Sequence, residues 1–183
     1  MLLRKRNSLA LICLLLVCCQ KIDLTTEPEN AGVADDSEKP ATIVGTGEGT
    51  AECPYTVTDI VTLSLSETEE VWVIGYMVGT APRSLNNAVF TADAGNQSNI
   101  LLSSDSLSSD IDNCIPVELH TAKLKDSFSV LTNNEHFRKC LVVKGIPKTY
   151  LYKNGLRNVS AGHWLDGFDI SSVAPTIWGS ITL

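Results

Sequence analysis

The adjacent thiols of Cys18 and Cys19 are the groups of this sequence most clearly placed for covalent chemistry. They close an apolar stretch, residues 8–17, that follows three basic residues at positions 4–6. A basic start and a short apolar core are typical of a secretory signal, because these ten residues are about half of the ~20 that a membrane-spanning helix needs. An ordinary signal ends in small residues of the A-x-A type, whereas this one ends in Leu-Val-Cys-Cys. The pattern predicts a signal peptide over residues 1–18.

This ending resembles a bacterial lipobox, in which a cysteine thiol receives diacylglycerol and the cysteine becomes the new N-terminus. Cleavage before Cys19 places the small Cys18 in front of the cut, whereas cleavage before Cys18 places the branched Val17 there. We therefore expect lipidation at Cys19, with Cys18 as the alternative register. Each buried CH₂ contributes about 0.8 kcal/mol, so an anchor of two or three chains would be nearly permanent. The other interpretation is a plain signal or stop-transfer segment with incidental cysteines.

Charge limits the partners that the mature chain could bind. Removal of residues 1–18 takes away three basic and no acidic residues, which leaves 165 residues with 11 basic and 21 acidic side chains, a net charge of −10. This length suffices for one domain with a linker. Because nucleic-acid binding depends on Lys and Arg that displace counterions from phosphate, the acidic balance disfavours a nucleic-acid partner.

The remaining cysteines and the histidines form no recognisable metal or catalytic motif. The chain has no C-x-x-C or H-x-x-x-H pair for zinc, and no G-x-S-x-G or H-E-x-x-H motif for hydrolysis. We therefore expect no metal, no cofactor and no enzymatic activity. At most one disulfide can form among Cys53, Cys114 and Cys140, and the sequence does not decide whether it does. A hydrolase would need a cleft that holds an acid beside His120, His136 or His163.

The chain after the signal divides into a linker and a domain. Residues 19–45 lack aromatic side chains and apolar periodicity and are rich in acids, which predicts a flexible acidic linker. Residues 46–183 alternate short apolar segments with turn residues, and Pro116 suggests a sheet edge or a bulge. We expect a helix within 54–65 that is capped by Thr56 or Thr58, and a short helix within 124–137 that stops at Asn133-Asn134. We expect strands at 71–80, 114–120, 139–148 and from 155, a hairpin of 88–93 with 98–104, and an extra strand in the tail 161–183.

This order of elements favours a mainly β fold, a small OB-like Greek-key β-barrel with one or two short helices. The segment 71–80 is apolar on both faces and contains Gly75 and Gly79, as expected of a long strand that bends at a barrel corner. A generic small barrel or sandwich remains the alternative on periodicity alone.

Several blocks together resemble a family of OB-like domains of unknown function in Bacteroidetes lipoproteins. These blocks are GTGEG…CPYTVTDIVTL, VWVIGYMVGT, NILLSSD, CIPVELH and VVKGIPKTYLYKNGLRNV, in family order over residues 46–160. The resemblance implies a core at 46–160, with 161–183 as a C-terminal extension, and it supplies no catalytic residues. In larger proteins, related domains lie beside secreted nucleases or peptidases. No acidic run after Cys19 marks surface export, so the sequence does not decide which membrane carries the anchor or which face the domain occupies.

An OB-like fold directs attention to two loops, because such domains bind ligands on the face of the second and third strands between the first and fourth hairpin loops. Here these loops are residues 80–87 and 148–155. Tyr150, Tyr152 and Lys153 form an aromatic and basic cluster that could stack on bases or sugar rings, with Arg83 as a possible partner. In the plainer interpretation the tyrosines close the end of the barrel and Lys153 is solvated.

We therefore expect a lipid-anchored module of the bacterial cell envelope that binds or assembles with an unknown partner, a protein or a glycan. The alternatives are a nucleic-acid-binding accessory domain and a hydrolase with a cryptic site. The spacing of Asp105, Asp110 and Asp112 does not fit a calcium loop, and we expect these acids to be solvated.

Overall fold

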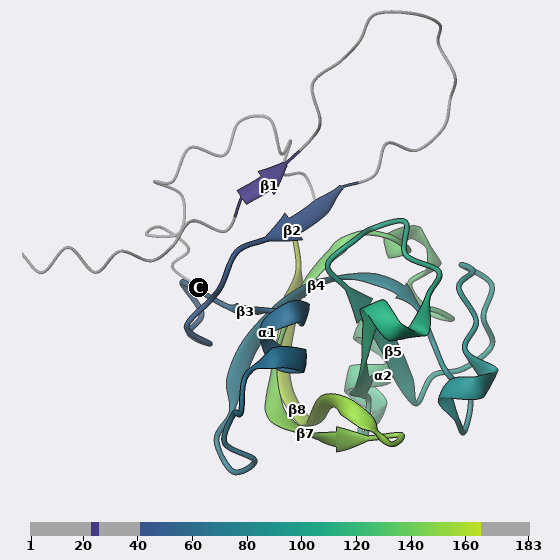
Figure 1. Cartoon of the computed structure of the whole chain (residues 1–183). Helices are drawn as coiled ribbons and strands as arrows, with labels where there is room; N and C mark the ends of the chain where they lie inside the picture. Colours follow the sequence, from purple (N-terminus) through teal and green to yellow (C-terminus); the bar gives the residue numbers. More distant parts are fainter. Residues whose placement is uncertain (1–22, 26–40, 166–183) are drawn as a thin grey trace, which may run out of the picture.

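The computed structural model describes residues 23–25 and 41–165 (Figure 1). Cys19, the predicted lipidation site, and its alternative Cys18 lie outside the described residues. So do residues 166–183, which make up most of the predicted C-terminal extension.

A six-stranded mixed sheet forms the body of the described chain, and five of its strands close into a ring. The strand order is β3-β4-β5-β6-β8-β7, and β7 also pairs with β4, so that β3 stands outside the ring. The pairs β6–β8 and β3–β4 are parallel and the others are antiparallel. A mainly β fold is thereby confirmed. The strands are β3 (Tyr55–Thr56), β4 (Val71–Gly79), β5 (Asn99–Ser103), β6 (Cys114–Glu118), β7 (Cys140–Tyr150) and β8 (Lys153–Trp164).

Both sides of the ring are packed with apolar side chains. Alternate residues of all five strands point inward and form the inner cluster, to which Val73, Met77, Ile100, Leu102, Ile115, Val117, Leu141, Val143 and Leu156 belong. Their neighbours point outward and form the outer cluster, which contains Ile43, Ile74, Tyr76, Val78, Ala81, Leu101, Cys114 and Val142. The continuous apolar sequence of β4 follows from this arrangement, because both faces of the strand are buried.

Two short helices complete the inner cluster. α1 (Val57–Thr62) begins at a capping box, in which Asp59 Oδ2 accepts a hydrogen bond of 2.8 Å from Thr56 N and the Thr56 hydroxyl accepts one from Asp59 N. α2 (Ala122–Phe128) has Thr121 as its N-cap and lies between β6 and β7 in the sequence. The predicted cap at Thr56 is confirmed for α1. α2 ends at Phe128, before the predicted stop at Asn133-Asn134, and a 3₁₀ turn, η3 (Asn134–His136), follows.

Two expectations about strands were wrong. Residues 88–93 form no strand, and only Val89 makes an isolated bridge, with Thr80. The edge of β5 that the predicted hairpin required is occupied by β4. Pro116 lies within an interior strand and pairs with Leu101 of β5. Its missing N–H is tolerated because β6 meets β8 in register only at Val117.

An outer layer covers part of the ring. β2 (Thr42–Val44) pairs with β1 (Asp23–Thr25), and Ile43 inserts into the outer cluster with only 2% of its surface exposed. Ile43 N donates to the Ser104 carbonyl at 2.7 Å, which fixes β2 beside the end of β5. The packed part of the domain therefore begins by Ala41, before the predicted boundary at residue 46. Figure 1 shows β1 and β2 at the top of the ring.

Candidate functional site

The outer face of β5 and β6, where an OB-like domain would bind its ligand, is closed by the protein's own chain. Leu101 of β5 and Cys114 of β6 are 0% exposed. Side chains from the connections between strands pack on this face, among them Leu85, Phe90, Ile111 and Leu151. A ligand cannot stack on these strands without displacing the side chains that cover them. The remaining candidate sites lie at the rim of the ring and beside α2.

The β7–β8 hairpin presents the predicted aromatic residues at its tip. Tyr150 pairs with Lys153, so the loop contains only two residues, Leu151 and Tyr152. Their φ angles are 51° and 67°, the left-handed values required at both positions of a type I′ turn. Such turns prefer Asn-Gly or Asp-Gly because a side chain with a Cβ is strained there. The Tyr152 side chain is fully exposed at this tip.

Contacts on either side of Tyr152 fix the hairpin tip to the domain. Leu151 packs against the outer cluster. The Lys153 ammonium donates a hydrogen bond to the carbonyl oxygen of Ile111, in the 3₁₀ turn η2 (Ile111–Asn113). Lys153 is therefore a structural tether and not the solvated cation of the plainer interpretation. The two anchors hold the exposed ring of Tyr152 in a defined place.

Tyr150 lies in a polar network that connects the two predicted loops. The Arg157 guanidinium lies 5.8 Å from the centroid of the Tyr150 ring and donates two hydrogen bonds of 3.2 Å to Glu118. Burial raises the pKa of the Tyr150 phenol, although a hydrogen bond with Asn99 opposes this effect. Asn99 Oδ1 also accepts from the backbone N–H of Ala81 at 2.8 Å, at the base of the loop 80–87.

Arg83 is the predicted site residue that the structure does not join to this group. It is exposed, has a φ of 65°, and precedes the 3₁₀ turn η1 (Leu85–Asn87). Within residues 41–165, no hydrogen bond, ion pair or ring contact links it to Tyr150, Tyr152 or Lys153. The candidate site therefore consists of the hairpin tip, defined here as residues 150–153.

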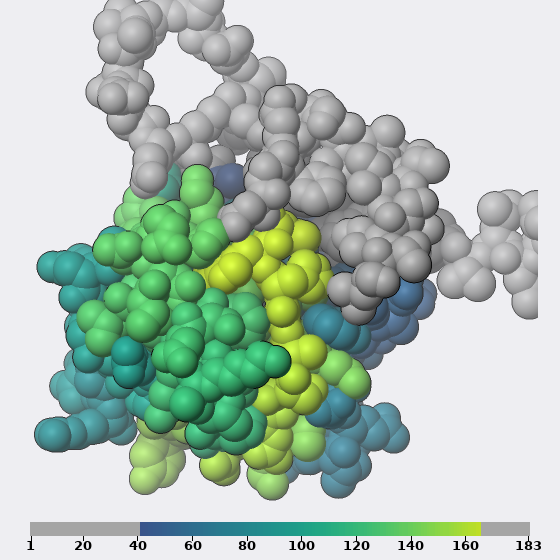
Figure 2. All heavy atoms as spheres, turned by 180° about the vertical axis from the view of Figure 1, so that it is seen from behind, coloured from purple at the N-terminus to yellow at the C-terminus, as the bar shows by residue number. Residues whose placement is uncertain are grey.

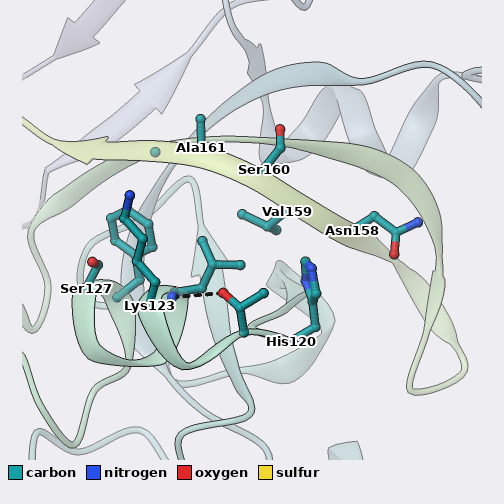
Figure 3. A pocket seen from close by; sticks show the side chains of 11 residues that line it. His120, Lys123, Ser127, Asn158, Val159, Ser160 and Ala161 are labelled. Atoms are coloured by element: carbon teal, nitrogen blue, oxygen red, sulfur yellow. Dashed lines mark hydrogen bonds between the residues drawn. The ribbon is translucent and has the colours of Figure 1, made fainter.

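A second concave site lies between α2 and β8, and the sequence did not reveal it. Figure 2 shows α2 and β8 side by side on one face of the molecule. The groove between them has a volume of about 540 Å³. Figure 3 shows His120 and Lys123 extending from the α2 side toward β8, with Val159 between them. The lining residues are spread over two distant segments without a common motif, which is why periodicity and spacing gave no signal.

The remaining polar candidates have structural roles. Cys114 and Cys140 are free thiols, and burial raises their pKa values to about 11 and about 12, so both stay protonated at neutral pH. Asp110 Oδ1 accepts from Asp112 N at 2.9 Å, and Asp105 Oδ1 accepts from Leu107 N at 2.9 Å, so two of the three loop acids stabilise turns. Within the described ranges, no three His, Cys, Asp or Glu side chains gather as a metal site.

Comparisons with known proteins give a family and no function. No helix in the described part of the chain is long and apolar enough to cross a membrane. No curated protein and no solved structure matches the chain. A family model described as a domain of unknown function, DUF6359, matches residues 55–165, which is more than half of the chain and includes the whole five-stranded ring. The match begins at residue 55, later than the predicted 46. It ends at residue 165, later than the predicted 160, and so takes in the last residues of β8. The chain belongs to the DUF6359 family of domains of unknown function.

Proposed function

We propose that the ring is an OB-like barrel and that it serves as a lipid-anchored binding module of the bacterial cell envelope. The order of elements supports the fold: β4, β5 and β6 stand as the first three strands, α2 follows, and β7 and β8 stand as the fourth and fifth. The parallel contact of the third and fifth strands and the pairing of the first and fourth close the ring. The basic and apolar start that ends at Cys19 supports the anchor.

The observation that carries the binding proposal is the exposed ring of Tyr152. A non-glycine residue in the left-handed region costs about 1–2 kcal/mol. Leu151 offsets this cost by packing on the outer cluster, but Tyr152 makes no such contact and lies in solvent. Folding therefore does not explain why an aromatic residue stands at this position. A rigid, exposed aromatic side chain is the kind of anchor that partners bury in protein interfaces.

Two cations near the tip are bound by the protein itself, which favours a protein or glycan partner over nucleic acid. Lys153 is bound to the Ile111 carbonyl and Arg157 to Glu118, so neither is free to neutralise phosphate. This arrangement weakens the case for the alternative of a nucleic-acid-binding accessory domain. A hydrolase site at His120 also lacks support, since no acidic side chain lines its groove.

The experiment is a pull-down from solubilised envelopes with the full chain, the Tyr152→Ala variant and a Leu131→Ala control. Leu131 is an exposed apolar side chain outside the hairpin, 47% accessible, so the control shows whether removing exposed apolar surface elsewhere has the same effect. We expect a partner, or a glycan on an array, that Tyr152→Ala loses by at least about tenfold and Leu131→Ala retains. Equal recovery with all three proteins would show that the tip is not the binding surface. Salt-sensitive binding of single-stranded DNA would instead select the nucleic-acid alternative.

The anchor has its own test. Radiolabelled palmitate should enter the wild-type protein and the Cys18→Ala variant but not the Cys19→Ala variant. Labelling that survives Cys19→Ala and disappears with Cys18→Ala would move the lipid to Cys18. Labelling of neither cysteine would leave a plain secretory signal.

A further inference from the structure

The groove between α2 and β8 combines an apolar floor with a lysine at its rim. Leu124, Phe128 and Val159 line it with side chains that are mostly buried, at 8%, 6% and 2% exposure. Its volume of about 540 Å³ lies within the range of roughly 300–1,000 Å³ typical of small-molecule sites. The site is thus large enough for a small ligand and offers it apolar surface.

Lys123 is the charged side chain among the residues that line the groove. His120 lines it too, and no acidic side chain does, although the chain as a whole is acidic. Two cations on the ring are engaged: Lys144 Nζ lies 2.7 Å from Glu70 Oε2, and Arg157 is paired with Glu118. Within the described residues, Lys123 makes no ion pair or hydrogen bond. Its ammonium group is therefore available to an anion.

A bulge in β8 shapes the far wall of the groove. The β7–β8 register jumps from Lys144↔Ala161 to Ile146↔Arg157, so that three residues, 158–160, stand opposite Gly145 alone. Asn158, within the bulge, has a φ of 51° and lines the groove. Irregular strands and left-handed residues recur beside binding sites, where they redirect side chains. The bulge places an amide group at the same rim as Lys123 and His120.

We propose that this groove binds a small amphipathic anion, with its apolar body against Leu124, Phe128 and Val159 and its acidic group at Lys123. His120 and Asn158 supply further hydrogen-bond donors at the rim. This site is separate from the hairpin tip, so the proposal stands or falls independently of the tip's role. A carboxylate and a phosphate monoester both have the required chemistry, and the experiment distinguishes them.

The test uses the full chain in lipid nanodiscs, titrated calorimetrically with sodium hexanoate, hexyl phosphate and the neutral hexanol, with empty nanodiscs as the blank. We expect saturable binding of at least one anion, and the stronger of the two identifies the acidic group. Hexanol should bind at least about tenfold more weakly, because it lacks the charge-assisted hydrogen bond to Lys123.

Variants locate the binding. Lys123→Met should weaken anion binding by about tenfold, whereas Lys125→Met, on the same helix but outside the groove, should leave it unchanged. Melting curves that match the wild type confirm that both variants fold. The proposal is overturned if neither anion binds saturably, if hexanol binds equally well, or if the two lysine variants behave alike.

Discussion

Both sides of the ring carry a cluster of buried apolar side chains, but the two clusters differ in what covers them. The inner cluster is enclosed by the strands themselves and by α1 and α2. The outer cluster is covered by residues from β2 and from the connections between strands, such as Ile43, Phe90 and Leu151. In an OB-like domain that binds ligands on its open sheet, this outer face would be accessible. Here it has become a second core, and the two binding sites that we propose lie at the hairpin tip and in the groove beside α2.

The strongest test of this comparison substitutes neighbouring residues of β5 that point to opposite sides. Leu102 belongs to the inner cluster and Leu101 to the outer cluster, and both are 0% exposed. We expect Leu102→Ala and Leu101→Ala each to lower the free energy of unfolding by about 2–5 kcal/mol, the usual cost of a buried leucine cavity. Denaturant titration measures both. A loss below about 1 kcal/mol for Leu101→Ala alone would show that the outer face is an open surface.

The cover over the outer cluster can be tested through β2. We expect Ile43→Ala to lower the free energy of unfolding by about 2 kcal/mol, toward the lower end for buried isoleucines because β2 lies at the edge of the structure. Val44, the next residue, is 40% exposed and provides the control. Val44→Ala should cost less than about 0.5 kcal/mol. Similar small losses for both variants would mean that β2 does not seal the outer face.

A substitution at the hairpin tip should raise the free energy of unfolding rather than lower it. Tyr152→Gly removes the strain of a left-handed non-glycine residue but adds backbone freedom to the unfolded chain. We expect a net gain of about 0.5–1 kcal/mol in the free energy of unfolding, measured by thermal or chemical denaturation. If Tyr152→Gly also abolished binding of the proposed partner, Tyr152 would favour binding at the expense of stability. A clear destabilisation would indicate that the Tyr152 ring contributes packing.

We expect the smallest effect from the ion pair of Glu70 with Lys144, which is partly exposed to solvent. Hydrogen bonds with Lys144 and then with Ser160 hold the pKa of Glu70 below its usual value of 4.5. A lowered pKa means that the stabilisation is present above the ordinary pKa and is lost as the pH falls through the folded-state value. Glu70→Gln should therefore cost less than about 1 kcal/mol at pH 7, because the pair is partly exposed, and this cost should shrink as the pH falls below 4.5. A cost that persists in acid would contradict an ionic origin.

The sequence was informative where burial is set by local pattern. The strands predicted at 71–80, 98–104, 114–120 and 139–148 are found as β4, β5, β6 and β7, because continuous or alternating apolar residues mark buried strands. It failed where distant segments decide the outcome. Residues 88–93 have the composition of a strand, but β4 takes the pairing edge of β5 and leaves Val89 a single bridge.

The candidate site at the hairpin tip was likewise predictable only where the local sequence determines it. Tyr150, Tyr152 and Lys153 could be placed in one hairpin loop from their spacing alone. The roles of Tyr150 and Lys153 could not, because Asn99, Glu118 and Ile111 are distant in sequence. Closure of the outer face and the groove at Lys123 likewise depend on how the connections fold back on the ring, which no local pattern records.

The position of β8 has a consequence for how the protein is made. β8 is the last strand of the ring in sequence, yet it lies between β6 and β7. A nascent chain that has reached residue 152 therefore holds two strands with open edges and cannot complete its hydrogen bonding. Exposed edges of this kind recruit other chains. Synthesis that stops before Lys153, or proteolysis that removes β8, should thus yield an aggregating fragment rather than a smaller functional domain.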